Sequence, residues 1–282
     1  MKPTRGRVSS EPLGTYALGL ATYGPLARTV ADSALLLDVM QGAVAGDEYT
    51  VAAPQGTFLA AAQTPPASPL RVAISAKLPP GILTRLSADQ RRAHDQTARL
   101  LAELGHHVVE RDPEYGLASL EFIQAFLRAA HEELATLERP DLTERSTRQL
   151  AAIGGRLVSP ARRVKLLAKR PATTARIAKL WNEFDVLLTP GLARTAIAAE
   201  GGYGRSGPLA FEQAARFVPF FAAFNLTGQP AISIPAGFGA DGLPLSVQLV
   251  GRHGDEETLY SLAGQLEAAR PWAGERPPLA EL

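Results

Sequence analysis

The chain has no cysteine, which excludes disulfide bonds, thiolate nucleophiles and thiolate metal sites. This absence is consistent with a reducing compartment, so we expect a cytoplasmic protein. The sequence also lacks any run of the ~20 consecutive apolar residues that a membrane-spanning helix needs. Its first residues, which include Lys2 and Arg5, hold no apolar stretch typical of a secretory leader. We therefore expect no membrane partner.

Charge of one sign is not in excess. The 282 residues include 29 Lys and Arg against 28 Asp and Glu, a formal net charge of +1. Proteins that bind nucleic acid are usually more basic, so we expect no nucleic-acid partner. The segment from Arg156 to Arg176 has seven basic and no acidic side chains. It could attract phosphate groups, but we favour the solvated face of a helix.

The sequence also lacks motifs for metal binding, for phosphate binding and for the nucleophile elbow of a serine hydrolase. The five histidines show no metal-ligand spacing, and His131 with its acidic neighbours indicates a surface cluster on a helix. The glycines between Gly201 and Gly207 follow no strand and precede no P-loop lysine, so they indicate a flexible loop. There is no Gly-x-Ser-x-Gly elbow. Ser9 and Ser10 have no evident general base, which favours a turn or a cap.

The first half of the chain has the pattern of an α/β protein. Residues 29–41 predict a helix that Thr29 caps and Gly42 ends. Residues 70–75 and 107–110 predict strands on either side of a helix that begins with a capping box at Ser87 and Gln90. This order predicts a βαβ unit and a sheet with helices on its faces.

The second half predicts helices followed by an antiparallel hairpin. Residues 118–184 are mainly helical in pattern, with breaks expected at Pro140, Gly154-Gly155, Pro160 and Pro171. The later expectations are a strand at 184–189, two strands at 231–234 and 245–250 joined through Asp241-Gly242, and a helix that Asp255 caps.

Five ordered segments resemble the amidase signature family. They are KPTRGRVS from Lys2, YGPLARTVAD from Tyr23, FDVLLTP from Phe184, FNLTGQPAISIP from Phe224 and GLPLSVQLVG from Gly242. They occur in the family's order and extend over nearly the whole chain, which makes the match specific.

The resemblance implies a fold and a reaction. The implied fold is α/β, with α/β/α layers around a mixed twisted sheet that is incomplete at the N-terminal side. Residues 1–282 would be the C-terminal portion of a single amidase-signature domain. The implied reaction is hydrolysis of carboxylic amides by a nucleophilic serine, a second serine held by a cis peptide and a basic lysine, with no metal and no cofactor.

The family's catalytic residues precede the segment that Lys2-Pro3-Thr4 matches. No catalytic residue can therefore be assigned to a numbered position. We expect Met1 to be an internal position of a longer family protein or the true start of a remnant gene.

A substrate pocket can still be suggested from what remains. Aromatic side chains near a glycine-rich loop can line an apolar site, although core packing is the commoner role of any one phenylalanine. The candidate substrate-binding residues are Thr189, Pro190, Phe217, Phe220, Phe221 and Phe224.

Three functions follow from this reading. The first is an amidase-family hydrolase of carbon–nitrogen bonds that is truncated and inactive alone, with a small-molecule amide as substrate once the missing part completes it. The alternative is a binding partner or complementing subunit of a separately encoded amidase half. An independent hydrolase with another nucleophile is disfavoured by the missing motifs. An exposed sheet edge could also promote self-association.

Overall fold

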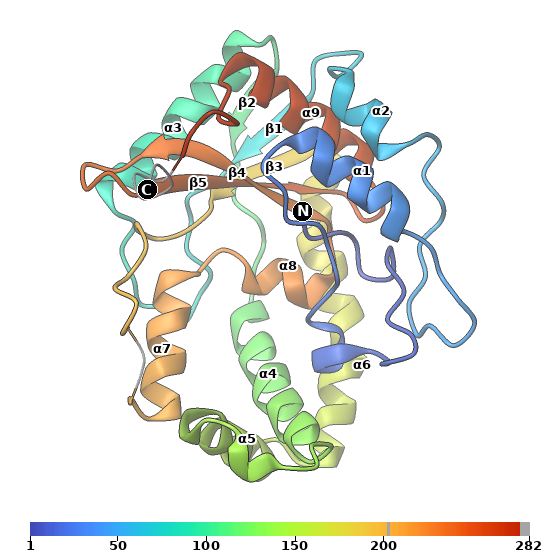
Figure 1. Ribbon diagram of the computed structural model, residues 1–282, viewed down its shortest axis with the longest axis vertical. Helices are drawn as coiled ribbons and strands as arrows, with labels where there is room; N and C mark the ends of the chain where they lie inside the picture. The colour runs from blue at the N-terminus through green and yellow to red at the C-terminus, as the bar shows by residue number, and fades with distance from the viewer. Residues whose placement is uncertain (202–203, 277–282) are drawn as a thin grey trace.

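The computed structural model describes residues 1–201 and 204–276, which form one sheet with helices on both faces (Figure 1). The strands are β1 (Arg71–Ile74), β2 (His107–Glu110), β3 (Val186–Pro190), β4 (Ala231–Phe238) and β5 (Pro244–Gly251). The α-helices are α1 (Val30–Met40), α2 (Phe58–Gln63), α3 (Ala88–Glu103), α4 (Ala118–Leu134), α5 (Arg145–Leu157), α6 (Pro160–Ala178), α7 (Gly207–Phe217), α8 (Ala222–Thr227) and α9 (Glu256–Ala269). Short 3₁₀ helices are η1 (Tyr16–Gly19), η2 (Pro140–Leu142) and η3 (Lys179–Asn182).

The sheet is mixed and open, with the strand order β2-β1-β3-β5-β4. Strand β1 is parallel to both neighbours, so that Ala73 pairs with Val109 on one side and with Leu187 on the other. Strand β5 is antiparallel to β3 and to β4. The expected mixed sheet, the βαβ unit and the terminal hairpin are therefore confirmed.

Alternate residues of the central strands supply two cores. Leu188 and Leu249 face a cluster with α1, α2, α3 and α9, whereas Leu187 and Val250 face a cluster with α4, α6 and α8. Figure 1 shows these helix groups above and below the sheet, with α5 and α7 farther from it. Packing on both faces of the sheet explains why every residue of β3 is buried and why its polarity does not alternate.

Local capping signals set several of the element ends. The Thr29 side chain accepts a hydrogen bond from the Asp32 amide, and Asp255 does the same for the Thr258 amide. Both helices begin where their caps predict. Ser87 likewise accepts from the Gln90 amide at 3.2 Å.

Three local expectations are wrong. Gln90 does not return the second bond of a capping box, because its side-chain amide is buried without a partner. Gly154 and Gly155 lie inside α5 and do not break it. A Cβ on Gly154 would lie 1.8 Å from the Leu127 carbonyl oxygen, so this glycine permits close packing of α5 on α4. Pro171 lies inside α6, which continues through it.

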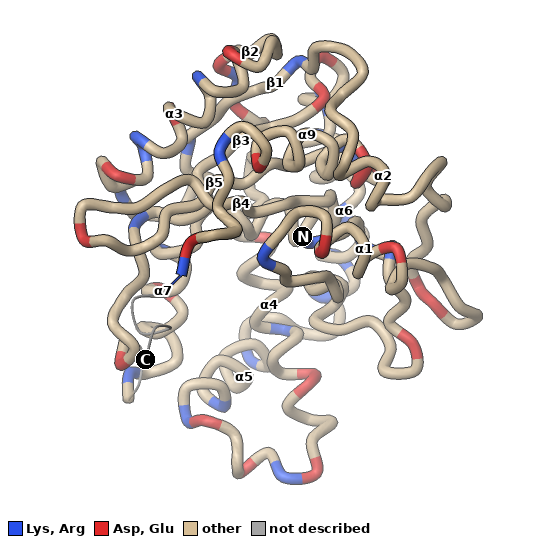
Figure 2. Tube along the Cα trace, turned by 45° about the horizontal axis from the view of Figure 1, so that its top comes forward, with Lys and Arg blue, Asp and Glu red and all other residues tan. Residues whose placement is uncertain are grey.

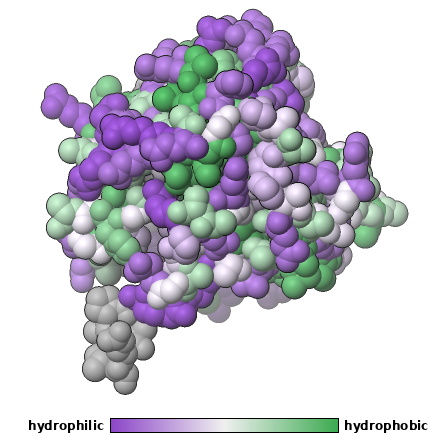
Figure 3. Space-filling model, turned by 90° about the horizontal axis from the view of Figure 1, so that it is seen from above, coloured by the Kyte–Doolittle hydropathy of each residue, from purple (hydrophilic) through white to green (hydrophobic). Residues whose placement is uncertain are grey.

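The basic segment of residues 156–176 ends α5 and forms most of α6. Its side chains are partly paired, as in Arg163 with Glu132 and Lys169 with Glu121. Figure 2 shows residues of both signs interspersed along the chain, and Figure 3 shows scattered hydrophobic patches on a largely hydrophilic upper face. Within residues 1–201 and 204–276, no helix combines the length and apolarity needed to cross a bilayer.

Candidate functional site

The two predicted pocket residues of β3 lie at the end of this central strand. Thr189 has no exposed surface, and its hydroxyl donates to the Pro190 carbonyl and accepts from the Gln248 amide at 3.0 Å. The same Gln248 amide donates to the Phe220 carbonyl at 3.4 Å. Thr189, Pro190 and Phe220 are therefore brought together through a buried polar link from β5.

The four phenylalanines differ in their surroundings. Phe220 and Phe224 have no exposed surface, and the Phe224 ring packs edge-on against Tyr115 with centroids 6.4 Å apart. Phe217 and Phe221 are only half-buried. The Phe217 carbonyl accepts from the Ala193 amide at 3.0 Å, which ties the end of α7 to the segment after β3. Phe224 belongs to the core cluster with α4, α6 and α8, whereas Phe217 and Phe221 have surface available to a ligand.

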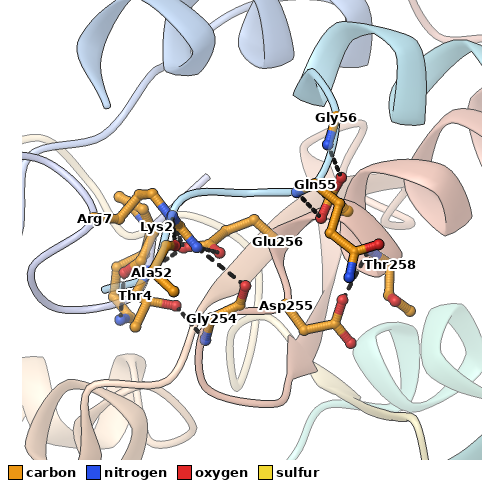
Figure 4. Close-up of polar contacts among 12 residues, drawn as sticks. Lys2, Thr4, Arg7, Ala52, Gln55, Gly56, Gly254, Asp255, Glu256 and Thr258 are labelled. Carbon is orange, nitrogen blue, oxygen red and sulfur yellow. Dashed lines mark hydrogen bonds and ion pairs between the residues drawn. The ribbon is translucent and has the colours of Figure 1, made fainter. Parts of the chain in front are cut away.

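The N-terminal segment, residues 2–7, contacts β4 and α9, and Figure 4 shows Lys2, Thr4 and Arg7 around Glu256 of α9. Lys2 forms an antiparallel bridge with Ala231 on the outer edge of β4. The Thr4 amide donates to Glu256 Oε1 at 2.8 Å, and Arg7 Nη2 donates to Glu256 Oε2 at 2.9 Å. The Arg7 and Glu256 side chains are 2% and 0% exposed. This segment therefore anchors the chain start to the last helix.

Burial changes the protonation of this segment. Desolvation, together with the charge of Arg5, lowers the pKa of Lys2 to about 7. Burial alone would raise the pKa of Glu256, but hydrogen bonds and charge from Arg7, with the bonds from Thr4, bring it below its ordinary value. Glu256 is therefore a buried carboxylate that Arg7 keeps ionised.

A cavity, which we call the loop cavity, lies where residues 5–10, 15–23 and 47–49 meet. Arg5 is part of its lining, and the Arg5 guanidinium donates to the carbonyls of Gly19, Asn225 and Leu226. Sequence analysis missed this cavity, because its lining comes from loops without a periodic pattern. A signal is present in Gly6, where φ is +88° and a Cβ would lie 2.6 Å from the Tyr49 backbone.

The turn beside this cavity has two residues in the left-handed conformation, and a side chain from another helix hydrogen-bonds to each of them. Ala17 and Leu18 have φ values of 51° and 53°, a conformation that is costly without glycine. Glu133 accepts from the Ala17 amide at 2.6 Å, and Arg170 donates to the Leu18 carbonyl at 2.8 Å. These charge-assisted bonds offset the strain and fix the wall of the cavity.

The serines near the chain start have structural contacts. The Ser9 hydroxyl donates to Asp47 and accepts from the Glu11 amide, which agrees with the predicted turn. Among the residues described, no serine hydroxyl is hydrogen-bonded to a lysine side chain; Ser75 accepts only from the backbone amide of Lys77 and donates to Asp112. The same residues hold no group of three His, Cys, Asp or Glu side chains placed to bind a metal. The glycine-rich loop of residues 201–207 falls partly outside the described residues.

Comparison with known proteins connects this arrangement to a family. The family model described as Amidase matches residues 1–260. The chain is 40% identical over 282 residues to the putative amidase AmiB2 of Mycobacterium tuberculosis, which covers 99% of the chain and 59% of AmiB2. It is 32% identical over 307 residues to the 6-aminohexanoate-cyclic-dimer hydrolase of a Pseudomonas strain, which covers 99% of the chain and 60% of that hydrolase.

Solved structures agree with this assignment. The structure of a 6-aminohexanoate cyclic dimer hydrolase superposes with a TM-score of 0.84 and 28% identity, covering 99% of the chain and 62% of that structure. The chain thus spans about 60% of the length of the relatives it matches. On the extent of these matches, the chain belongs to the amidase family.

Proposed function

We propose that this chain is part of an amide hydrolase and that its 282 residues do not hydrolyse amides alone. The observation that carries the proposal is the unequal coverage, 99% of this chain but 59% of AmiB2. The family resemblance assigns the nucleophilic serine, the cis-peptide serine and the lysine to a region that these residues do not match. A reaction that needs this nucleophile and base cannot proceed without them.

The proposal treats residues 1–282 as the C-terminal portion of a single domain. One sheet includes strands from residue 71 to residue 251, and Lys2 adds a bridge at its outer edge. The Arg7–Glu256 pair joins the first residues to the last helix. These links support one unit and offer no division into two.

A small-molecule amide is the proposed substrate of the completed enzyme. One relative is named as a hydrolase of the 6-aminohexanoate cyclic dimer, which makes a cyclic amide the first compound to test. We propose that Phe217 and Phe221 contact the substrate, because they are half-buried. Thr189, Pro190, Phe220 and Phe224 would support them from the core. The proposed compartment is the cytoplasm, which cell fractionation would test.

Complementation tests this proposal. The chain is incubated with the cyclic dimer, alone and with a separately expressed N-terminal part of AmiB2, and released amine is measured. We expect no turnover by the chain alone and turnover in the mixture. An N-terminal part with its nucleophilic serine replaced by alanine is the control. Turnover by the chain alone that a substitution within it abolishes would contradict the proposal.

A binding role is the second candidate, favoured by the free edge of β4. Strand β4 is last in the sheet order, and among the described residues only Lys2 pairs with its outer edge. Ser233 and Pro235 on this strand are exposed. Such an edge can accept a strand from a complementing polypeptide or from a second copy. Sedimentation of the chain, alone and with the AmiB2 part, distinguishes self-association from complementation.

A further inference from the structure

The lower half of the molecule contains an arginine that its surroundings do not satisfy. Arg170 of α6 is 6% exposed, and its Nη1 donates to the Leu18 carbonyl at 2.8 Å. Its Nε and Nη2 atoms are buried and have no hydrogen-bond partner. An unmet donor of this kind destabilises the folded chain, and more so when it belongs to a charged group. A buried guanidinium in this condition is a source of positive potential for its neighbourhood.

Nearby charges offset this potential only in part. Arg5 lies close enough that the charge of Arg170 adds to burial in lowering the pKa of Arg5 to about 10. Burial also lowers the pKa of Arg170, and Tyr49, Glu48 and Glu121 offset this effect only in part. The Asp47 carboxylate accepts from the amides of Val44 and Ser10, and Glu256 is paired with Arg7. Glu48 is itself exposed to solvent.

Of these two arginines, only Arg5 lines the loop cavity. The lining also includes Asp47 and three tyrosines, Tyr16, Tyr23 and Tyr49. The Arg5 guanidinium lies 5.2 Å from the centroid of the Tyr49 ring. The Thr22 hydroxyl on the same wall is buried and has no partner. The cavity thus combines aromatic walls, an unpartnered hydroxyl and the Arg5 guanidinium, which together suit a small anion with an apolar body. The Asp47 carboxylate in the lining already accepts hydrogen bonds from the Ser9 hydroxyl and from the Ser10 and Val44 amides.

We propose that this cavity binds the carboxylate group of a small apolar acid. Arg5 and the Thr22 hydroxyl would contact the carboxylate, the tyrosines would enclose the apolar body, and Arg170 would strengthen binding through its charge from behind the wall. The choice of ligand rests on the proposed function, since hydrolysis of an amide releases a carboxylic acid and an amine. The cavity would hold the acid that is released or an acidic group of the substrate.

Benzoate and benzamide are suitable probes, because they have nearly the same shape and only benzoate is charged. A ligand that binds only the folded chain raises its melting temperature by mass action. Benzoate should therefore raise the melting temperature of the 282-residue chain in a concentration-dependent way, at low ionic strength, and benzamide should not. Equal effects of the two compounds, or no effect of benzoate, would overturn the inference.

Substitutions then locate the site. Arg170→Gln should weaken benzoate binding, measured by calorimetry, by about fivefold or more through loss of a nearby charge. Arg176→Gln is the matched control, because Arg176 is on the same helix but donates to the carbonyls of Glu114 and Tyr115. It should leave benzoate affinity unchanged. Unchanged binding by Arg170→Gln would overturn the role assigned to Arg170.

Two further variants keep the test decisive if Arg170→Gln does not fold. Thr22 is half-buried and Tyr23 is 44% exposed, so Thr22→Val and Tyr23→Ala should retain the fold. Both should weaken benzoate binding, and full retention by both would overturn the site. Failure of the proposed function is distinguishable, because benzoate binding needs no turnover. Turnover by the complemented mixture without benzoate binding by the chain would overturn this inference alone.

Discussion

Replacement of Glu256 by glutamine probes the anchor between the N-terminal segment and α9. Glu256 accepts from Arg7 Nη2 at 2.9 Å, from Arg7 Nε at 3.2 Å and from the Thr4 amide at 2.8 Å. The substitution removes the charge and leaves the buried Arg7 guanidinium without its counter-ion. Removal of one partner of a buried pair costs about 3–5 kcal/mol. We expect Glu256→Gln to lower the free energy of unfolding by this amount.

Urea unfolding followed by circular dichroism measures this loss as a shift of the midpoint. The control is Glu212→Gln, which breaks an exposed pair with Arg216 and should cost less than about 1 kcal/mol. The double variant Arg7→Met with Glu256→Gln should lose clearly less stability than the sum of the two single variants, because each single variant leaves an unpaired buried charge and the double variant leaves none. A Glu256→Gln midpoint equal to that of Glu212→Gln would refute the reasoning.

The pH dependence of the same variant gives an independent check. The pKa of Glu256 is lower in the folded chain than its ordinary value. Its contribution to stability is therefore present above the ordinary carboxyl pKa and is lost as pH falls through the folded value. The difference between the wild type and Glu256→Gln should shrink in acid. A difference that stays constant down to acid unfolding would contradict this assignment.

Three other predictions concern single residues. The pKa of Lys2 is lowered to about 7 in the folded chain, so the unfolded chain binds more protons than the folded chain between about pH 7 and 10. The free energy of unfolding should therefore rise with pH over this range. The urea midpoint of Lys2→Met should rise less than that of the wild type. Gly154→Ala should destabilise the chain although alanine favours helices, because the added Cβ would clash with a carbonyl of α4. Gly274→Ala, at a position with open space around it, should be neutral in the same assay. Phe224→Ala should cost about 3–5 kcal/mol, and the half-buried Phe217→Ala clearly less, by thermal unfolding; equal losses would argue against their different burial.

Local signals allowed much of the fold to be predicted. Thr29 and Asp255 cap helices through amides three residues away, and Asp241-Gly242 turns a hairpin within a few residues. Each signal acts over a short stretch of chain and needs no knowledge of the rest. The breaks expected at Gly154 and Pro171 failed because a tertiary contact and the continuing helix prevailed over local preference.

The candidate site depended on contacts between distant segments. Gln248 of β5 links Thr189 to Phe220 through two hydrogen bonds. Nothing in the sequence indicates that the Gln248 side chain would lie between these two residues. The loop cavity brings Arg5 together with Tyr49, and Arg170 approaches both from a helix more than a hundred residues later. Sequence periodicity cannot predict contacts between such distant loops and helices. In the structure, the unpaired Nε and Nη2 donors of Arg170 draw attention to this region.

The basic start of the chain shows how the same residue type can have different roles. Lys2, Arg5 and Arg7 would ordinarily be assigned to a solvated surface, yet all three are partly or wholly buried. Arg7 is neutralised by a carboxylate, and Lys2 has a pKa lowered to about 7, so part of its population is uncharged at neutral pH. Arg5 donates only to carbonyl groups, which carry no net charge, and its pKa, although lowered to about 10, keeps it charged at neutral pH. Arg5 is therefore the one of the three whose charge remains available to an anion in the loop cavity.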